Sequence, residues 1–176
     1  FRLCLEARLG QRALEISVSV EHRRSPSDAG AQSPLEAQPP LEPSPMPFSF
    51  GLHPYFAIAS LAGLRFEGLP QRCFDHHAMA EDATETQLAR IGEGMDLLTR
   101  PSGPVRFRDG EGGIELQCSH PWDLVVLWSE PPRPMVCLEP WTGPRQALLS
   151  GDRRLELAPG TQMRLQSRFV CLDPQR

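Results

Sequence analysis

Two segments of the sequence share one pattern: an apolar run, then a titratable residue, a proline and an aromatic residue. They are FSFGLHPYF at 48–56 and MVCLEPW at 135–141. A proline confines the residue before it to extended backbone and tends to end strand pairing. His53 and Glu139 are therefore predicted to be held stiffly at the ends of two strands. An imidazole and a carboxylate held in this way can exchange protons with a substrate as general acid and general base.

The surroundings of these two residues indicate the same chemistry. Side chains alternate between the two faces of a strand, so Glu139 shares a face with Cys137 and Met135. A carboxylate on such an apolar face is partly desolvated, which moves its pKa upward, towards that of a useful general base. Tyr55 and Trp141, the aromatic residues that follow the two prolines, would supply a wall on which a sugar ring stacks.

The elements that position these residues are strands, because apolar residues recur along the chain with a period of two. The segments 1–9 and 14–20 alternate in this way, which predicts a β-hairpin with one buried face. Further short extended segments follow, separated by glycine- and proline-containing turns. These are 48–56, 64–66, 71–75, 105–107, 114–118, 124–128, 136–139, 155–158 and 163–172. Such spacing predicts an all-β sandwich or barrel, with short helices only at 83–91 and 145–149.

One stretch breaks this pattern. Residues 23–47 contain seven prolines among Ser, Ala, Gln and Glu, with almost no apolar side chain to bury. Such a composition cannot offset the entropy cost of ordering the chain, so a disordered, exposed insertion is predicted there. A proline-rich segment can also bind an aromatic groove of a partner, which leaves open a role as an interaction module.

The charge and composition exclude several classes of function. All 18 basic residues are Arg, so the chain lacks the lysine that a P-loop, a Schiff-base enzyme or a pyridoxal enzyme needs. With 22 acidic residues the net charge is −4, and the longest arginine runs are the pairs at 23–24 and 153–154. Nucleic-acid binding needs a basic stripe, so no nucleic-acid partner is expected.

The cysteines and the hydropathy indicate the cellular setting. Five cysteines, without a C-x-x-C pair, lie mostly within apolar runs, which favours reduced core residues in a cytosolic protein over a disulfide framework. No apolar stretch approaches the roughly 18 residues of a membrane span, and no signal-peptide pattern opens the chain. A cytoplasmic protein without a membrane partner is expected. His76 and His77 do not predict a metal site, because adjacent strand side chains point to opposite faces.

The two motifs also carry a family resemblance. GLHPYF at 51–56 and VCLEPWT at 136–142, followed by LAPG at 157–160, resemble the galactose mutarotase-like (aldose 1-epimerase) family. The match is to the bacterial branch with H-P-Y-F and E-P-W-T signatures. The resemblance covers residues 48–170 in order and is compatible with the opening hairpin. It implies an antiparallel β-sandwich, part of a β-supersandwich.

The resemblance implies a reaction and its two catalytic residues. His53 would protonate the ring oxygen of a pyranose, and Glu139 would take the proton from the anomeric hydroxyl. The ring would then open, and closure would give the other anomer. Two proton transfers suffice for this reaction, so the resemblance implies neither a metal nor an organic cofactor.

The resemblance also implies residues that bind the sugar. Asp96, in the segment GMDL at 94–97, resembles a family Asp that binds sugar hydroxyls. Tyr55 and Trp141 would line the same site. Arg145 follows soon after Glu139 and is a candidate for binding the phosphate of a sugar phosphate.

The extent of the chain bears on its activity. Members of the family carry a further His and an Arg in an N-terminal half of the sandwich, for which these 176 residues have no room. We therefore expect residues 1–176 to be a single mutarotase-like β domain without that N-terminal part. Two functions stay open besides the interaction module. One is an aldose 1-epimerase acting on a hexose or hexose phosphate, and the other is a catalytically inactive carbohydrate-binding relative.

Overall fold

The computed structural model describes residues 1–23 and 44–174. The strands in this part of the chain are β1 (Arg2–Leu9), β2 (Ala13–Glu21), β3 (Met46–Phe48), β4 (Tyr55–Ala57), β5 (Arg65–Glu67), β6 (Arg72–Asp75), β7 (Ala80–Ala83), β8 (Met95–Thr99), β9 (Val105–Arg108), β10 (Gly113–Cys118), β11 (Leu124–Ser129), β12 (Met135–Trp141), β13 (Leu155–Leu157) and β14 (Gln162–Leu172). The helices are α1 (Thr84–Ala89) and α2 (Ala147–Ser150). Among the described residues, no helix is long and apolar enough to cross a membrane. The predicted all-β class is confirmed.

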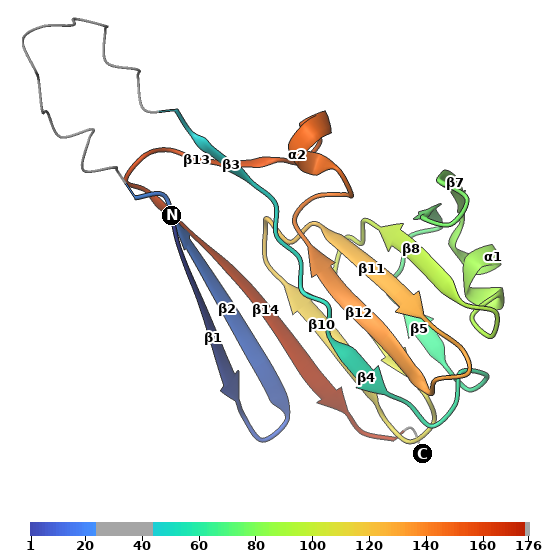
Figure 1. The fold of residues 1–176 in the computed structure, drawn as a ribbon. Helices are drawn as coiled ribbons and strands as arrows, with labels where there is room; N and C mark the ends of the chain where they lie inside the picture. The colour runs from blue at the N-terminus through green and yellow to red at the C-terminus, as the bar shows by residue number, and fades with distance from the viewer. Residues whose placement is uncertain (24–43, 175–176) are drawn as a thin grey trace, which may run out of the picture.

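The strands within these residues form two six-stranded antiparallel sheets and one two-stranded sheet. The first large sheet has the order β1-β2-β14-β10-β9-β5, and the second has the order β4-β12-β11-β8-β6-β7. The small sheet pairs β13 with β3. Figure 1 shows the two large sheets as the layers of a sandwich, with β12 and β11 in the layer nearer the viewer.

The core lies between the two large sheets. Val136 and Leu138 of β12 belong to the same buried cluster as Phe107 of β9, in the opposite sheet. Because side chains alternate along a strand, Cys137 and Glu139 point to the other face of β12, away from this core. The second sheet therefore has an apolar inner face and an outer face that carries titratable side chains.

The opening hairpin is confirmed, but the prediction that one of its faces is buried is wrong for β1. β2 buries Val18 and Val20, whereas every residue of β1 is exposed. The physical reason is that no other layer covers β1: none of its side chains belongs to either core cluster of the described residues. In the described part of the chain, Leu3 and Leu5 consequently remain exposed.

Several boundaries differ from the sequence-based prediction. The Pro-rich stretch 23–47 lies mostly outside the described residues, but its last two residues belong to β3, which pairs with β13. The strands β7 and β8 were not predicted. β7 has the polar sequence AEDA, which lacks an apolar face, and β8 is a short strand whose pairing with β11 and β6 comes from distant segments.

The prediction that the cysteines are mostly core residues is wrong for three of the five. Cys73 and Cys137 are buried, whereas Cys4, Cys118 and Cys171 are exposed, and all five are free thiols. The exposed three belong to β1, β10 and β14 of the first sheet. An apolar run in the sequence does not say which of its alternating positions faces the core.

Candidate active site

The two motif segments lie side by side as antiparallel neighbours. β4 pairs with β12 in a register that sets Tyr55 opposite Cys137. Extending this register by two residues along each segment puts His53 opposite Glu139. The pairing of one strand with another thus brings together an imidazole and a carboxylate that are far apart in the sequence.

β12 continues through its proline, so the prediction that Glu139 ends a strand is wrong. The strand runs to Trp141, and the carbonyl of Pro140 accepts a hydrogen bond from the N–H of Leu52 at 3.1 Å. Proline has no backbone N–H to donate, but its carbonyl can still accept a hydrogen bond. The pairing tolerates Pro140 because only this carbonyl is used in the contact with Leu52. Beyond it, an isolated bridge joins Gly51 to Trp141. A Cβ at position 51 would lie 2.9 Å from Trp141 Cδ1, so this close approach requires glycine.

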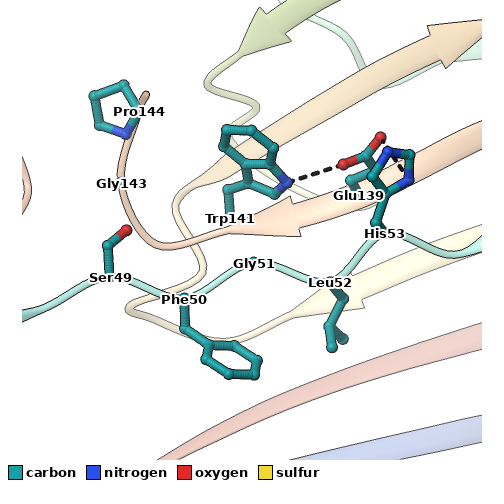
Figure 2. A pocket seen from close by; sticks show the side chains of 9 residues that line it. All are labelled: Ser49, Phe50, Gly51, Leu52, His53, Glu139, Trp141, Gly143 and Pro144. Carbon is teal, nitrogen blue, oxygen red and sulfur yellow. Dashed lines mark hydrogen bonds and ion pairs between the residues drawn. The ribbon is translucent and has the colours of Figure 1, made fainter. Parts of the chain in front are cut away.

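The imidazole and the carboxylate are in direct contact. His53 Nδ1 lies 3.2 Å from Glu139 Oε1 (Figure 2). The side chain of Glu139 is 1% exposed, whereas that of His53 is 50% exposed. The indole N–H of Trp141 donates a hydrogen bond to the second carboxylate oxygen, Oε2, at 3.0 Å. The contact with His53 does not have hydrogen-bond geometry, so Oε1 has no hydrogen-bond partner among the described residues.

This environment changes the acidity of the carboxylate. Burial raises the pKa of Glu139 to about 7, and the negative charge of Asp96 acts in the same direction. The hydrogen bond from Trp141 and the positive charge of Arg145 oppose the rise in pKa without cancelling it. A carboxyl group that titrates near neutrality can both accept and return a proton at physiological pH.

A cavity of about 320 Å³ opens beside this pair (Figure 2). The residues that line it are Ser49, Phe50, Gly51, Leu52, His53, Glu139, Trp141, Gly143 and Pro144. The volume lies at the small end of the range for small-molecule sites, which begins at about 300 Å³. Both titratable residues belong to the wall of this cavity, with the His53 side chain half exposed and that of Glu139 buried.

Two aromatic residues hold the ring of His53. The ring of Tyr55 stacks on it, with centroids 4.9 Å apart and planes within 3°. Trp128 meets both rings edge-on, at 5.7 Å from His53 and 5.9 Å from Tyr55. Tyr55 therefore braces the imidazole instead of lining the cavity. Sequence analysis missed Trp128, although the alternation of β11, whose Leu127 is in the core, would have placed it on the outer face.

A second cluster of charged groups surrounds Asp96, which lies in β8. Its Oδ1 is 2.6 Å from His76 Nδ1, and its Oδ2 accepts a hydrogen bond from Arg145 Nη2 at 2.7 Å. Burial raises the pKa of Asp96, but the hydrogen bond and charge of His76 and the charge of Arg145 outweigh it, so the net pKa lies below the ordinary value. Sequence analysis considered His76 only as a metal ligand and missed its contact with Asp96, because no local pattern connects it with a strand 20 residues away.

The two clusters are neighbours on the outer face of the second sheet. Trp141, which donates to Glu139, has its ring 6.2 Å from that of His76. Of the residues predicted for the site, the structure brings His53, Glu139 and Trp141 to the cavity wall. Asp96 and Arg145 form an ion pair with each other, outside the cavity lining.

One further side chain belongs to the surroundings of the pair. Cys137 Sγ, His53 and Glu139 offer three donor atoms that all lie within 4.8 Å of one another. Cys137 is fully buried, on the same face of β12 as Glu139. These are the residues of the described chain that could hold a metal ion.

Comparison with known proteins finds matches among solved structures. No family model and no curated protein matches the chain. Among solved structures, the Slr1438 protein of Synechocystis sp. PCC 6803 has a TM-score of 0.80 and 25% identity, covering 97% of this chain and 54% of its own. A candidate aldose 1-epimerase from Escherichia coli K12 has a TM-score of 0.68 and 16% identity, covering 96% of this chain and 59% of its own.

A third similar structure is also that of a mutarotase-type protein. The galactose mutarotase related enzyme from Lactobacillus acidophilus has a TM-score of 0.65 and 15% identity, covering 97% of this chain and 61% of its own. The chain thus spans between 54% and 61% of the length of these three proteins. It has the galactose mutarotase-like fold, and its structural neighbours are galactose mutarotase-like and aldose 1-epimerase proteins.

Proposed function

We propose that the site around His53 and Glu139 interconverts the α and β anomers of a hexose or hexose phosphate, as an aldose 1-epimerase does. The observation that carries this proposal is the 3.2 Å separation of the imidazole and the carboxylate at the wall of the cavity. The reaction needs an acid at the ring oxygen and a base at the anomeric hydroxyl. Both oxygens are bonded to one carbon, so the acid and the base must converge on one point, as this pair does.

The proposed reaction proceeds by two coupled proton transfers. Glu139 takes the proton of the anomeric hydroxyl while protonated His53 donates a proton to the ring oxygen, and the bond between the anomeric carbon and the ring oxygen breaks. The open-chain aldehyde rotates about its bond to the next carbon. The reverse transfers, with Glu139 returning its proton and His53 recovering one, close the ring to the other anomer. Each positioned group contributes about 10²–10⁴-fold to such a reaction.

The neighbouring side chains support these two roles. The hydrogen bond from Trp141 orients the carboxylate of Glu139, and burial keeps its pKa near neutrality. The stacked Tyr55 and the edge of Trp128 hold the imidazole of His53 in place. Rigid positioning of this kind lowers the barrier because the reacting groups need not be ordered during the reaction.

Arg145 favours a phosphorylated or otherwise anionic sugar. Its side chain is 50% exposed, and one of its five N–H groups is on Asp96. The remaining donors can bind a phosphate, for which the planar guanidinium group is well suited. We infer a hexose phosphate as the preferred substrate within the proposed reaction.

A catalytically inactive carbohydrate-binding protein is the second candidate. The observation that favours it is the burial of Glu139, whose side chain is 1% exposed and contacts the half-exposed ring of His53. A base must reach its proton within hydrogen-bond distance, so the imidazole would have to move aside for a substrate hydroxyl to contact the carboxylate. A sugar could then occupy the cavity without reacting.

One experiment separates the two candidates. The full chain is added to pure α-glucose, α-galactose or α-glucose 6-phosphate, and the decay of optical rotation is followed against buffer alone. Binding of the same sugars is measured by calorimetry. Faster decay than in buffer supports the isomerase, and binding without faster decay supports the binding protein. If the chain neither binds nor accelerates any of the sugars, both candidates are wrong.

A further inference from the structure

We propose that His53, Cys137 and Glu139 bind one Zn²⁺ ion, and that this ion blocks the site. The binding of the ion follows from the donor atoms alone. The block rests on the proposed function, because it assumes that His53 and Glu139 act as the acid and the base. The two parts are therefore tested by separate measurements.

The imidazole and carboxylate donors lie at a separation that suits zinc, and the thiol lies nearby. Two ligand atoms at about 2.0 Å from a tetrahedral Zn²⁺ are about 3.3 Å from each other. His53 Nδ1 and Glu139 Oε1 are 3.2 Å apart. The sulfur of Cys137, one ring nitrogen of His53 and one carboxylate oxygen of Glu139 all lie within 4.8 Å of one another. A tetrahedral site needs about 3.5 Å between the sulfur and each of the other two atoms. A movement of roughly an ångström would complete a three-ligand site.

The carboxylate lacks a partner that a cation would supply. Glu139 Oε1 is buried and accepts no hydrogen bond from the described residues. A buried carboxylate oxygen without a partner destabilises the fold, and coordination to a cation removes this cost. The other oxygen, Oε2, accepts the N–H of Trp141, which is the kind of outer contact that orients a metal-bound carboxylate.

The ligands are held on rigid elements. Cys137 and Glu139 are two residues apart on one face of β12, and both side chains are buried. The register of the sheet sets Cys137 between Tyr55 of β4 and Trp128 of β11, the same two rings that hold His53. His53 is half exposed at the cavity wall, so the fourth position of the ion faces the cavity and can take a water molecule.

The mixture of ligands selects the metal. A thiolate, an imidazole and a carboxylate suit Zn²⁺ and the chemically similar Co²⁺. Mg²⁺ and Ca²⁺ prefer sites built from oxygen ligands alone, so they are not expected to compete. With the ion bound, His53 Nδ1 and Glu139 Oε1 both hold metal, and neither can exchange a proton with a sugar.

Cobalt gives a test that does not depend on activity. A Co²⁺–thiolate bond absorbs in the near ultraviolet, and a tetrahedral Co²⁺ site absorbs strongly in the visible. The full chain is treated with a chelator, dialysed and titrated with CoCl₂. We expect both bands to saturate at one equivalent and to disappear when ZnCl₂ is added. Absence of the near-ultraviolet band would overturn the proposal.

Variants assign the bands to these residues. In a background in which the exposed Cys4, Cys118 and Cys171 are changed to Ser, the bands should persist. Adding Cys137→Ser to this background should abolish the near-ultraviolet band and weaken Zn²⁺ binding by at least about tenfold, since even outer contacts of a metal site contribute 10–100-fold. Persistence of the band after Cys137→Ser would place the metal elsewhere.

Two further measurements guard against misfolding and test the block. Glu139→Gln keeps the thiol but removes a ligand, so it should keep the circular dichroism of the wild type and lose Zn²⁺ affinity. If Zn²⁺ binds this variant as tightly as wild type, the proposed ligand set is wrong. To test whether the ion blocks the site, the mutarotation rate with Zn²⁺ is divided by the rate without it. This ratio should be well below one in wild type and near one after Cys137→Ser, which removes a ligand of the ion. A chain that binds Co²⁺ but accelerates no sugar would refute the proposed function and leave the metal site standing.

Discussion

Glu139 Oε1 faces His53 Nδ1 at 3.2 Å because β12 and the segment before β4 are paired in antiparallel register. Each of the two residues lies within the same short pattern, in which a proline and an aromatic ring follow. Pairing two such patterns head to tail brings the titratable groups together and spreads the aromatic residues on either side of them. Trp141 then contacts the carboxylate, and Tyr55 contacts the imidazole.

The first prediction concerns the proposed base and acid. Glu139→Gln keeps the shape of the side chain and removes its basicity, so mutarotation should slow by at least about 10²-fold while sugar binding persists. His53→Ala should slow it by a comparable factor. Because the two groups act in one exchange, the double variant should be little slower than either single variant. Polarimetry gives the rates, and Glu81→Gln, an exposed residue outside the site, is the control. A Glu139→Gln protein as fast as wild type would exclude the mechanism.

The second prediction concerns the stability cost of the same carboxylate. Burial raises the pKa of Glu139 from 4.5 to about 7, so ionising it costs the folded state free energy. Wild-type stability should therefore fall as the pH rises from about 4.5 to about 7 through this group. Glu139→Gln should remove the fall and give a higher thermal midpoint at pH values above 7. Calorimetry in a chelating buffer measures the midpoints. A lower midpoint for Glu139→Gln at high pH would contradict the prediction.

The third prediction concerns Asp96. Its net pKa lies below the ordinary value, so its ionised form stabilises the fold at neutral pH, and this contribution is lost as the pH falls through the lowered pKa. Asp96→Asn should reduce the free energy of unfolding at pH 7 by about 1–3 kcal/mol. The difference from wild type should shrink in acid, below the ordinary Asp pKa of about 3.9. Urea unfolding at several pH values measures it. A difference that does not depend on pH would show that the charge of Asp96 is not the cause.

The fourth prediction concerns the contact between Gly51 and Trp141. A Cβ at position 51 would lie 2.9 Å from Trp141 Cδ1, so Gly51→Ala should push the indole away and weaken its hydrogen bond to Glu139. Overpacking of this kind costs about 1–3 kcal/mol of stability, and the mutarotation rate should fall as well. The matched control is Gly103→Ala, where a Cβ would meet nothing within 4 Å. Equal effects of the two substitutions on rate would show that the contact has no role.

The fifth prediction concerns Arg145 and the charge of the substrate. Arg145→Gln should lower kcat/KM for glucose 6-phosphate by about 10–100-fold more than for glucose, since hydrogen bonds to charged groups contribute about 1.5–3 kcal/mol. Arg145→Lys should restore part of the loss by restoring the charge. Arg133→Gln, an exposed arginine that pairs with Glu130, is the control. An equal loss for both sugars would mean that Arg145 acts only by holding Asp96.

Most of the strands and the two titratable residues could be predicted from the sequence, because alternation and the effect of proline are local properties of the chain. The pairing of His53 with Glu139 could be expected only through the family resemblance, since register depends on segments far apart in the sequence. The same reason explains why the donor set of His53, Cys137 and Glu139 was not predicted. It exists only once the segment before β4 lies beside β12.

Other features could not be predicted for different physical reasons. Pro140 does not end its strand. It has no N–H to donate, but its carbonyl accepts a hydrogen bond from the N–H of Leu52, so the pairing continues. His76 is buried against Asp96, a contact made across the sheet and invisible in either local segment. The exposure of β1 arises because its side chains join neither core cluster of the described residues, which alternation alone does not reveal.

The contact between Gly51 and Trp141 has a consequence for the evolution of the site. The indole of Trp141 occupies the space that a side chain at position 51 would need. Positions 51 and 141 are therefore expected to change together. Relatives that keep a tryptophan after the glutamate–proline pair should keep a glycine two residues before the histidine. Relatives with a smaller residue at the first of these positions should admit alanine or serine at the second. This paired change would distinguish sequences that retain the same carboxylate geometry from those that share only the fold.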